Sequence, residues 1–196
     1  MTSKNSTRHA LPSDHPSMHD TLCQAFAADP LMAWLFPCAD GSADPEALAA
    51  FMTAEVAGHQ THGHSYVIDD SAVALWAPPG AVVDQSPVAD VMATFAEPER
   101  LHRSAESFLH MLEYHPTEPH FYLAMIGAND ASRGRGLGSV LLSRVLDICD
   151  AEGLVAHLES SNIRNVSLYE RHGFEVAAEV EFAPGVVLRP MTRRPR

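Results

Sequence analysis

The second half of the chain shows the clearest alternation of apolar runs and amphipathic stretches. Residues 121–126 read Phe-Tyr-Leu-Ala-Met-Ile, and such a nearly continuous apolar run is typical of a strand buried on both faces. Over 137–148 the apolar residues recur at helical spacing, which predicts an amphipathic helix that ends near Gly153. The shorter elements predicted beyond it are strands over 155–158, 174–182 and 186–191 and a helix over 165–171.

The first half of the chain is predicted to contribute mainly helices. A helix over 17–28 ends at Asp29-Pro30, because the residue before a proline avoids the helical conformation. A second helix begins at Asp44-Pro45, since aspartate caps helix N-termini and proline suits the first turn. The remaining predictions are strands over 65–68 and 72–77 that form a hairpin, and a helical stretch over 88–114 interrupted near Pro98.

Together these elements predict one domain of mixed α/β class. A chain of 196 residues has the usual size of a single domain. Residues 1–16 are polar and contain Pro12 and Pro16, so we expect a loosely ordered N-terminal arm with room for one short strand. The domain itself is expected over 17–196.

The composition narrows the classes of partner. A formal net charge of −12 disfavours nucleic acid and anionic membranes and is compatible with a cationic substrate. No run approaches the roughly 18 apolar residues of a membrane span. Cys23, Cys38 and Cys149 are far apart and odd in number, which indicates a reducing compartment. We therefore expect a cytoplasmic protein without nucleic-acid or membrane partners.

A glycine-rich segment stands between the predicted strand over 121–126 and the helix that follows it. The segment reads Arg133, Gly134, Arg135, Gly136, Leu137, Gly138 and Ser139. Glycines let the backbone turn sharply and approach a ligand closely, so that successive N–H groups point into one concavity. The start of the helix adds unpaired N–H groups and the positive end of its dipole. A pyrophosphate is the anion that suits this arrangement best.

Two other phosphate motifs can be tested against the same segment. A Walker A loop needs Gly-Lys-Ser/Thr, which the chain lacks. A dinucleotide loop needs G-x-G-x-x-G, but counting from Gly134 the third glycine position holds Ser139, and counting from Gly136 it holds Leu141. Glu159 nevertheless stands where a ribose-binding acid would sit, about 21 residues past the loop. A nucleotide-cofactor oxidoreductase is therefore weakened as an alternative but stays open.

The chain resembles the GNAT superfamily of N-acetyltransferases. Arg133, Gly136 and Gly138 match that family's cofactor signature Q/R-x-x-G-x-G/A. A second family signature, an asparagine followed by a short helix ending in tyrosine and then Gly-Phe, matches the stretch from Asn162 to Phe174. Over 115–192 the closest similarity is to the puromycin N-acetyltransferase-like group, carried by Glu118-Pro119, Leu123-Ala124, Gly136–Ser139, Leu158-Glu159, Arg164-Asn165 and Tyr169–Arg171.

The resemblance implies a GNAT-like fold and a place for acetyl-CoA. Such a fold has a central, mostly antiparallel mixed sheet, splayed between two parallel strands and flanked by helices. The acceptor half is expected at about 17–119 and the acetyl-CoA half at about 120–192. The cofactor-binding residues implied are Met125, Ile126 and Ala128 on the central strand, Arg133, Gly134, Arg135, Gly136, Leu137, Gly138 and Ser139 in the loop, and Asn162, Asn165 and Tyr169 beyond it.

The same resemblance implies roles in the reaction. The N–H of Ile126 would polarise the thioester carbonyl, and Tyr169 is expected to act as the general acid that protonates the departing thiolate. Glu118 is named as the candidate base. The other candidates for the base are His115, His120, Tyr122 and Glu159. His59, His62 and His64 do not match a zinc spacing, so no metal is expected and they are interpreted as solvent-facing or acceptor-site histidines.

The function that follows from the resemblance is transfer of an acetyl group from acetyl-CoA to a primary amine. The acceptor is expected to be a small molecule that attacks directly in a ternary complex, as in enzymes of the antibiotic-resistance type. The alternatives are a protein or peptide N-acetyltransferase and a non-catalytic CoA-binding sensor. Because members of the family are often dimers, a homodimer is also expected.

Overall fold

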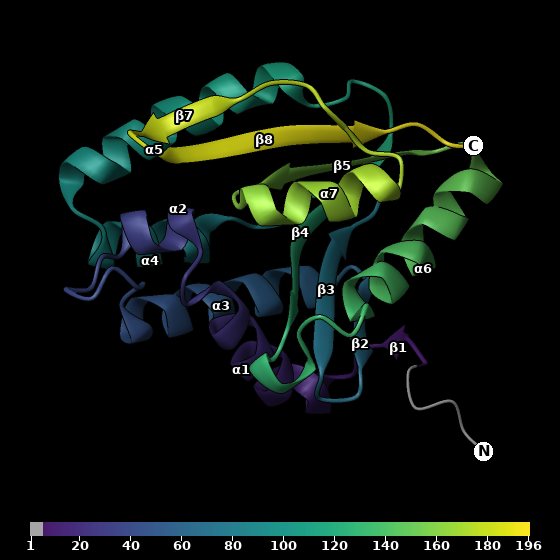
Figure 1. The fold of residues 1–196 in the computed structure, drawn as a ribbon, viewed down its shortest axis with the longest axis horizontal. Coiled ribbons are helices and arrows are strands. Elements are labelled where there is room, and N and C mark those ends of the chain that lie inside the picture. Colours follow the sequence, from purple (N-terminus) through teal and green to yellow (C-terminus); the bar gives the residue numbers. More distant parts are fainter. Residues whose placement is uncertain (1–5) are drawn as a thin grey trace.

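The computed structural model describes residues 6–196, and these form a mixed β-sheet covered by helices on both faces (Figure 1). The sheet order is β1-β2-β3-β4-β5-β8-β6, with β7 paired to β8, and β4 and β5 run parallel. The strands are β1 (Arg8–His9), β2 (Ser65–Ile68), β3 (Ala72–Ala77), β4 (His120–Ala128), β5 (Val155–Ser160), β6 (Glu175–Val176), β7 (Val180–Ala183) and β8 (Val186–Arg193). This is one domain of mixed α/β class with a mostly antiparallel sheet, as the sequence predicts.

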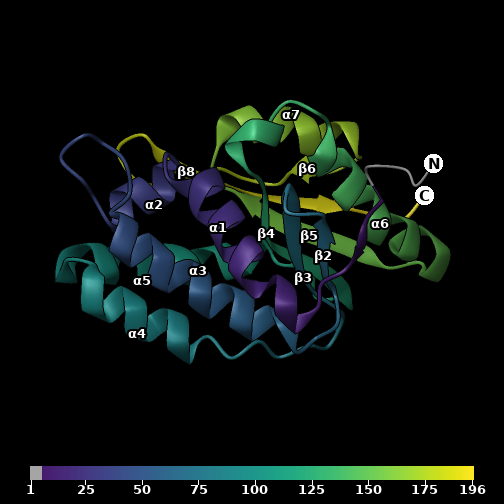
Figure 2. The ribbon, with the colours of Figure 1, turned by 90° about the horizontal axis from the view of Figure 1, so that it is seen from below.

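The helices form a layer on each face of this sheet. One layer holds α1 to α5, and the other holds α6 and α7, as the view from below shows (Figure 2). The helices are α1 (His15–Phe26), α2 (Pro30–Leu35), α3 (Pro45–Gln60), α4 (Ser86–Phe95), α5 (Pro98–Met111), α6 (Leu137–Glu152) and α7 (Ile163–Arg171). Within residues 6–196 no helix is both long and apolar enough to cross a membrane.

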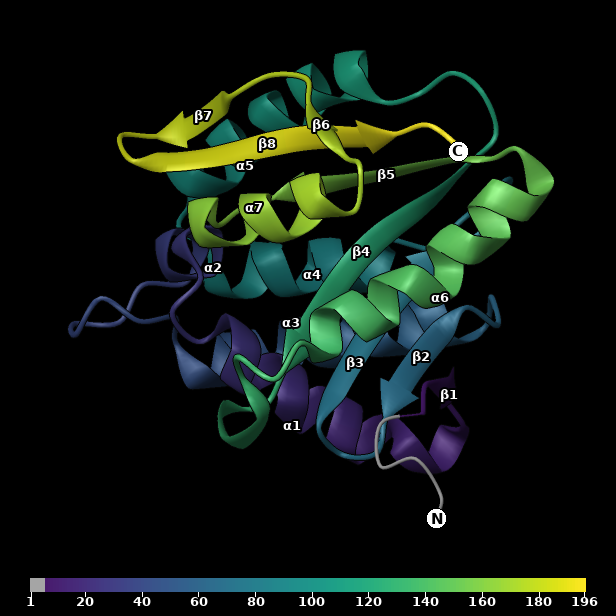
Figure 3. The same ribbon diagram turned by 45° about the vertical axis from the view of Figure 1, so that its right-hand side comes forward.

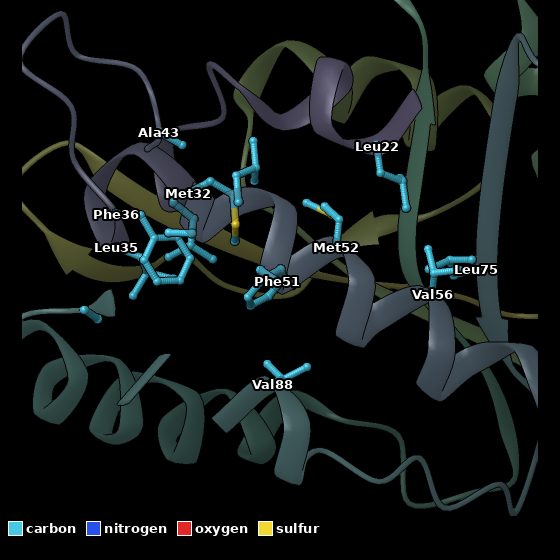
Figure 4. Close-up of a cluster of buried hydrophobic side chains, with 14 of the residues drawn as sticks. Leu22, Met32, Leu35, Phe36, Ala43, Phe51, Met52, Val56, Leu75 and Val88 are labelled. Atoms are coloured by element: carbon cyan, nitrogen blue, oxygen red, sulfur yellow. The ribbon is translucent and has the colours of Figure 1, made fainter. Parts of the chain in front are cut away.

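The alternation of side chains along the hairpin divides the core between the two faces. Val73 and Leu75 of β3 pack towards α1 and α3, whereas Ala74 and Trp76 pack towards α6. Both sets are buried, which explains why β3 is apolar at every position. In the cluster that packs between the sheet and α1 to α5, Val56 of α3 lies beside Leu75, and Phe51 lies above Val88 of α4 (Figure 4).

The parallel pair β4–β5 separates part of the way along its length. The two strands are in register from His120 with Val155 to Leu123 with Leu158, and β4 then continues alone on that side (Figure 3). At the same place the ladder between β3 and β4 skips Ala124, since Leu75 pairs with Met125 and Trp76 with Leu123. A β-bulge of this kind bends a strand. The bulge and the splay together open the sheet in the middle of β4.

Most of the predicted elements are confirmed. The hairpin over 65–68 and 72–77 has the predicted bounds, Asp44 caps α3, and the break near Pro98 separates α4 from α5. Of the N-terminal arm, residues 1–5 lie outside the described residues. In the rest of the arm β1 pairs with β2, in line with the short strand that was expected, and α1 begins at His15, two residues before the predicted helix.

The prediction of one strand over 174–182 is wrong. The chain forms β6 and β7 there, both paired with β8. The amide of Ala177 donates to the carbonyl of Pro190, but a proline has no N–H to return the bond. In a strand the N–H and C=O of one residue point to the same side. The N–H that Pro190 lacks would therefore have pointed towards β6 and β7, and its absence interrupts their ladder with β8.

Candidate active site

The glycine segment forms a turn that leads directly into α6. Gly134 and Gly136 have φ angles of 74° and 78°, a region that L-residues other than glycine rarely adopt, and Gly136 is the residue before the first helical position. The first N–H groups of α6 have no intrahelical acceptor and point out of this end of the helix. The turn and the start of α6 therefore offer unpaired backbone N–H groups at one place.

The arginines of the segment take different places. The guanidinium of Arg133 donates to the carbonyl of Gln24 and lies 3.1 Å from the carboxylate of Asp130, so it ties the loop to the end of α1. Arg135 donates to the hydroxyl of Ser132 at 3.4 Å. Gly138 lies so close to α7 that an added Cβ would stand 3.3 Å from Cδ2 of Leu168. The small residue at 138 thus brings α7 against the loop.

A cleft of about 480 Å³ opens where β4 and β5 separate. Its floor is formed by Leu123 to Ile126 of β4 and Leu158 to Ser160 of β5, and its walls come from α2, α3, α4, α5 and α7. Most of the lining is apolar. The polar and ionisable side chains that line it are Asp29, Glu55, His59, Gln85, His115, Tyr122, Glu159, Ser160, Ser161, Asn165 and Tyr169. This combination of an apolar cavity with a few convergent polar groups is typical of a small-molecule site.

Tyr169 stands on α7 at the edge of this cleft. Its side chain is 5% exposed, and its ring packs edge-on against Phe174 with centroids 6.1 Å apart. Burial raises the pKa of the Tyr169 hydroxyl, and the charge of Asp29 raises it further. The hydroxyl therefore stays protonated and can act only as a donor towards a developing anion.

Two of the implied cofactor residues on this side differ in their contacts. Asn165 lines the cleft. The side chain of Asn162 instead caps α7, where it accepts a hydrogen bond of 3.0 Å from the amide of Arg164. Asn162 thus has a structural role at the start of α7.

Asp29 connects two elements that line the cleft. Its carboxylate caps α2 by accepting from the amides of Leu31 and Met32, and it accepts a 2.5 Å hydrogen bond from the hydroxyl of Ser161. Burial raises the pKa of this carboxyl, against the opposite effect of those hydrogen bonds. Asp29 therefore links α2 to the loop between β5 and α7.

Glu159 is the centre of a buried hydrogen-bond cluster at the splay. Its carboxylate accepts from Nε2 of His115 at 2.6 Å and from the hydroxyl of Tyr122 at 2.7 Å, and Nε2 of His157 lies at 3.3 Å. Burial by itself would raise the pKa of Glu159, but the bonds from His115, His157 and Tyr122 outweigh it and hold the pKa at about 2. Glu159 is therefore ionised throughout the neutral range.

The tautomers of the two histidines follow from their partners. Burial lowers the pKa of His157, so its ring is neutral near pH 7; its Nδ1 accepts from the hydroxyl of Thr192, 2.9 Å away, while Nε2–H faces Glu159. His115 donates its Nε2–H to Glu159, and when neutral it keeps a lone pair on Nδ1. Glu159 thus orients an imidazole that lines the cleft.

The same three side chains have the composition of a metal site. The ligand atoms of His115, His157 and Glu159 all lie within 4.8 Å of one another. Two atoms that ligate one zinc ion, each at about 2.0–2.1 Å, are held roughly 3 Å or more apart. The 2.6 Å between His115 and Glu159 is instead the length of a direct, charge-assisted hydrogen bond. The proton network accounts for the cluster without an ion.

We expect Glu159→Gln to destabilise the protein above pH 4.5. A glutamine brings an N–H₂ group to a place already filled by the donors of His115, His157 and Tyr122. The folded-state pKa of about 2 lies below the reference value of 4.5, so the carboxylate stabilises the fold above pH 4.5, by roughly 3 kcal/mol, and this stabilisation is lost as pH falls through 2.

The measurement is urea unfolding at several pH values between 2 and 7. Wild type should lose stability on acidification more steeply than Glu159→Gln. Glu118→Gln, which removes an exposed carboxylate, serves as the control. Parallel pH profiles for wild type and Glu159→Gln would contradict the assignment of this network.

Not all candidates for the base lie in the cleft. Glu118 sits in the loop before β4, where its carboxylate lies 3.1 Å from the guanidinium of Arg194, and it lines a separate surface hollow. His120 bonds the carbonyl of Glu118 through Nδ1. The structure thus groups His115, Tyr122 and Glu159, and it leaves Glu118 apart from Tyr169.

Two acidic residues of the cleft were not among the predicted site residues. Asp29 is predicted only to end a helix, and Glu55 appears in the sequence only as one position on the apolar face of the helix after Asp44. A carboxylate on a core-facing stripe is unusual, since Glu is seldom fully buried unless paired. That signal could have marked Glu55 as functional. Of the histidines at 59, 62 and 64, His59 is the one that lines the cleft.

Comparison with known proteins agrees with this geometry. The model of the acetyltransferase (GNAT) family matches residues 45–174. An uncharacterized N-acetyltransferase of Schizosaccharomyces pombe is 39% identical over 54 residues, which are 28% of this chain and only 22% of the yeast protein. Among solved structures, a Corynebacterium glutamicum protein described as histone acetyltransferase HPA2 and related acetyltransferase has a TM-score of 0.72 at 24% identity, covering 97% of this chain and 96% of that one.

A second solved structure, arylalkylamine N-acetyltransferase 2 from Aedes aegypti, has a TM-score of 0.66 at 13% identity and covers 97% of this chain and 99% of its own. At these identities the structural matches show a shared fold. The family model spans most of the chain, including the splayed strands, the glycine loop and α7. The chain belongs to the GNAT family of acetyltransferases.

Proposed function

We propose that this protein transfers an acetyl group from acetyl-CoA to the primary amine of a small molecule. The observation that supports this most directly is that β4 and β5 form the floor of an apolar cleft where they separate, while β4 leads along the chain to the glycine turn before α6. The turn suits a pyrophosphate, and the cleft suits an amine with an apolar body.

The residues present fit acetyl-CoA. The amides of 134–139 would hold its pyrophosphate, because Gly134 and Gly136 adopt the positive φ angles that such a turn needs. Beyond Leu123 the described part of the chain gives β4 no partner strand on the β5 side, so the backbone around Ile126 and Ala128 is available to the amides of the pantetheine arm. Acetyl-CoA supplies the activated acetyl thioester.

The reaction needs one proton acceptor and one proton donor. The amine nitrogen attacks the thioester carbonyl, an N–C bond forms, and the C–S bond breaks to release CoA. His115, oriented by the ionised Glu159, is the best-placed group to take the proton from the amine through Nδ1. Tyr169 supplies a hydroxyl proton to the departing sulfur. Glu118 is replaced in this role because its carboxylate pairs with Arg194 at the surface.

The acceptor is proposed to be a neutral or cationic amine rather than a peptide. The cleft is walled by Met32, Phe51, Met92 and Phe108 and has acidic groups within it, which suits a compact apolar molecule carrying an ammonium group. The similarity of residues 115–192 to the puromycin N-acetyltransferase-like group points the same way. So does the arylalkylamine substrate class in the name of the Aedes aegypti structure.

An acceptor screen with acetyl-CoA tests this proposal. We expect CoA thiol release with small primary amines, including puromycin, at least tenfold above the rate with peptides bearing free N-termini or lysines. If puromycin were acetylated more slowly than a simple polyamine, the assignment to the puromycin-like group would be wrong, but acetyl transfer to small amines would stand. Activity confined to peptides would exclude the small-molecule acceptor, and CoA binding without turnover on any amine would favour a sensor.

A further inference from the structure

A second buried acidic site lies in the cleft, on the helix layer opposite the sheet. Glu55 and His59 are one turn apart on α3, are 6% and 1% exposed, and both line the cleft. Nδ1–H of His59 donates to the backbone carbonyl of Glu55 at 3.0 Å and lies 3.3 Å from Oε2 of its carboxylate. Within the described residues Oε2 of Glu55 and Nε2 of His59 have no hydrogen-bond partner.

An unpaired carboxylate oxygen in such a place is costly. Burying a charged oxygen without a hydrogen bond costs several kcal/mol, and buried carboxylates are normally paired. From α3 and α4 the cleft is lined mainly by apolar side chains, such as Phe51, Val88 and Met92, together with Gln85 just before α4. Because Glu55 lines the cleft while its Oε2 lacks a partner, a molecule bound in the cleft is the group that can supply the missing donor.

Glu55 is distinct from the group that is proposed to bind the reacting amine. His115, Tyr122 and Glu159 already satisfy one another on the sheet side. Glu55 belongs to α3, across the cleft, yet its charge reaches Tyr122, where it adds to burial and to Glu159 in raising the pKa of the hydroxyl. The two acidic groups therefore line one cavity from different elements, Glu55 from α3 and Glu159 from β5.

We propose that Glu55, positioned by His59, binds a second cationic group of the acceptor, an ammonium or a guanidinium. The acceptor is then a diamine or related dication with an apolar linker, which presents one amine to His115 and the other to Oε2 of Glu55. This inference rests on the proposed acetyltransferase function and specifies its substrate class. A carboxylate that pairs with a bound cation forms a charge-assisted hydrogen bond, which is stronger than a hydrogen bond between neutral groups.

Matched acceptors test the subsite. We expect wild type to have a kcat/KM for hexamethylenediamine at least tenfold above that for hexylamine, which is more than the factor of two from the second reactive amine. Glu55→Gln should lower kcat/KM for the diamine roughly 10- to 100-fold, as expected for loss of a hydrogen bond to a charged group, mainly through KM. The monoamine should change less than twofold.

Two further variants and a folding measurement serve as controls. Glu46→Gln removes an exposed carboxylate from the first turn of the same helix and should alter neither acceptor. Glu55→Asp keeps the charge but draws it back, so it should restore part of the preference and shift it to a longer diamine. Glu55→Gln should keep the wild-type melting temperature or exceed it, because it removes an unpaired buried charge.

Several results would overturn the subsite. One is equal wild-type kcat/KM for the two acceptors, and another is an equal loss for both in Glu55→Gln. A fall in kcat alone would place Glu55 in the chemistry instead. These outcomes leave acetyl transfer standing. Absence of thiol release with every amine, in a protein that binds CoA, would overturn the proposed function and the subsite together.

Discussion

Replacing Gly136 by valine is expected to abolish measurable binding of CoA and acetyl-CoA while leaving a folded protein. Gly136 has a φ of 78°, and open space surrounds the position of an added Cβ, so the substitution acts through the backbone and not through a clash. The left-handed conformation costs an ordinary residue roughly 1–2 kcal/mol, and a β-branched one more. Valine therefore drives the turn to another conformation, in which the amides of 134–139 no longer point into one concavity.

The other end of the same helix provides a matched control. Gly153 follows α6 with a φ of 70° and also has open space around its missing Cβ. Gly153→Val imposes a similar backbone penalty far from the proposed phosphate site, so it should lower the melting temperature to a similar degree and keep CoA affinity. Calorimetric titration measures the CoA affinity of both variants, and thermal unfolding measures their melting temperatures. CoA affinity that survived in Gly136→Val would show that the loop is not the cradle, and tighter binding of a dinucleotide would revive the oxidoreductase alternative.

The parts of the site that the sequence predicts well are those that depend on local spacing. The positive φ at Gly136 and the helix start at Leu137 both follow from residues within one turn of each other. Physical rules for turns and helix starts act at that range. Elements of this kind are readable because no distant partner decides them.

The grouping of the proton network depends on a pairing that is remote in sequence. Tyr122 and His157 are opposite each other in the parallel register of β4 and β5, and Glu159, two residues on, points to the same face. Glu118 lies only four positions from Tyr122 along the chain, but the register ends before it. Sequence alone offers both carboxylates, and only the register decides which one enters the cleft.

The acceptor side of the cleft is even harder to predict from the sequence, because it also depends on how distant elements pack. Glu55 and Asp29 belong to helices that line one cavity only because α2 and α3 pack on the face of the sheet where β4 and β5 separate. Helical periodicity can say that Glu55 faces inward. It cannot say whether the inward side meets packed side chains or a cavity. That difference separates a destabilising buried charge from a binding group.

Tyr169→Phe is expected to lower the rate constant of acetyl transfer about 100- to 10,000-fold, the range typical of a lost general acid, and to leave acetyl-CoA affinity nearly unchanged. The hydroxyl is buried at the edge of the cleft, and burial, followed by the charge of Asp29, raises its pKa. It is therefore fully protonated at neutral pH and ready to donate when sulfur becomes anionic. Phenylalanine keeps the packing against Phe174 but cannot donate.

Single-turnover kinetics with thiol detection separates acetyl transfer from product release. A second buried tyrosine serves as the control for the loss of a hydroxyl. Tyr66 is fully buried on β2, outside the cleft, and its hydroxyl lies 3.2 Å from Nδ1 of His64. Tyr66→Phe should alter stability slightly and turnover hardly at all. If Tyr169→Phe, with a wild-type melting temperature, retained the wild-type single-turnover rate, the tyrosine would be a packing residue and another donor would have to protonate the thiolate. A large loss at 169 beside an unchanged rate at 66 would assign the effect to the hydroxyl at the cleft, because both substitutions remove the same atom from a buried ring.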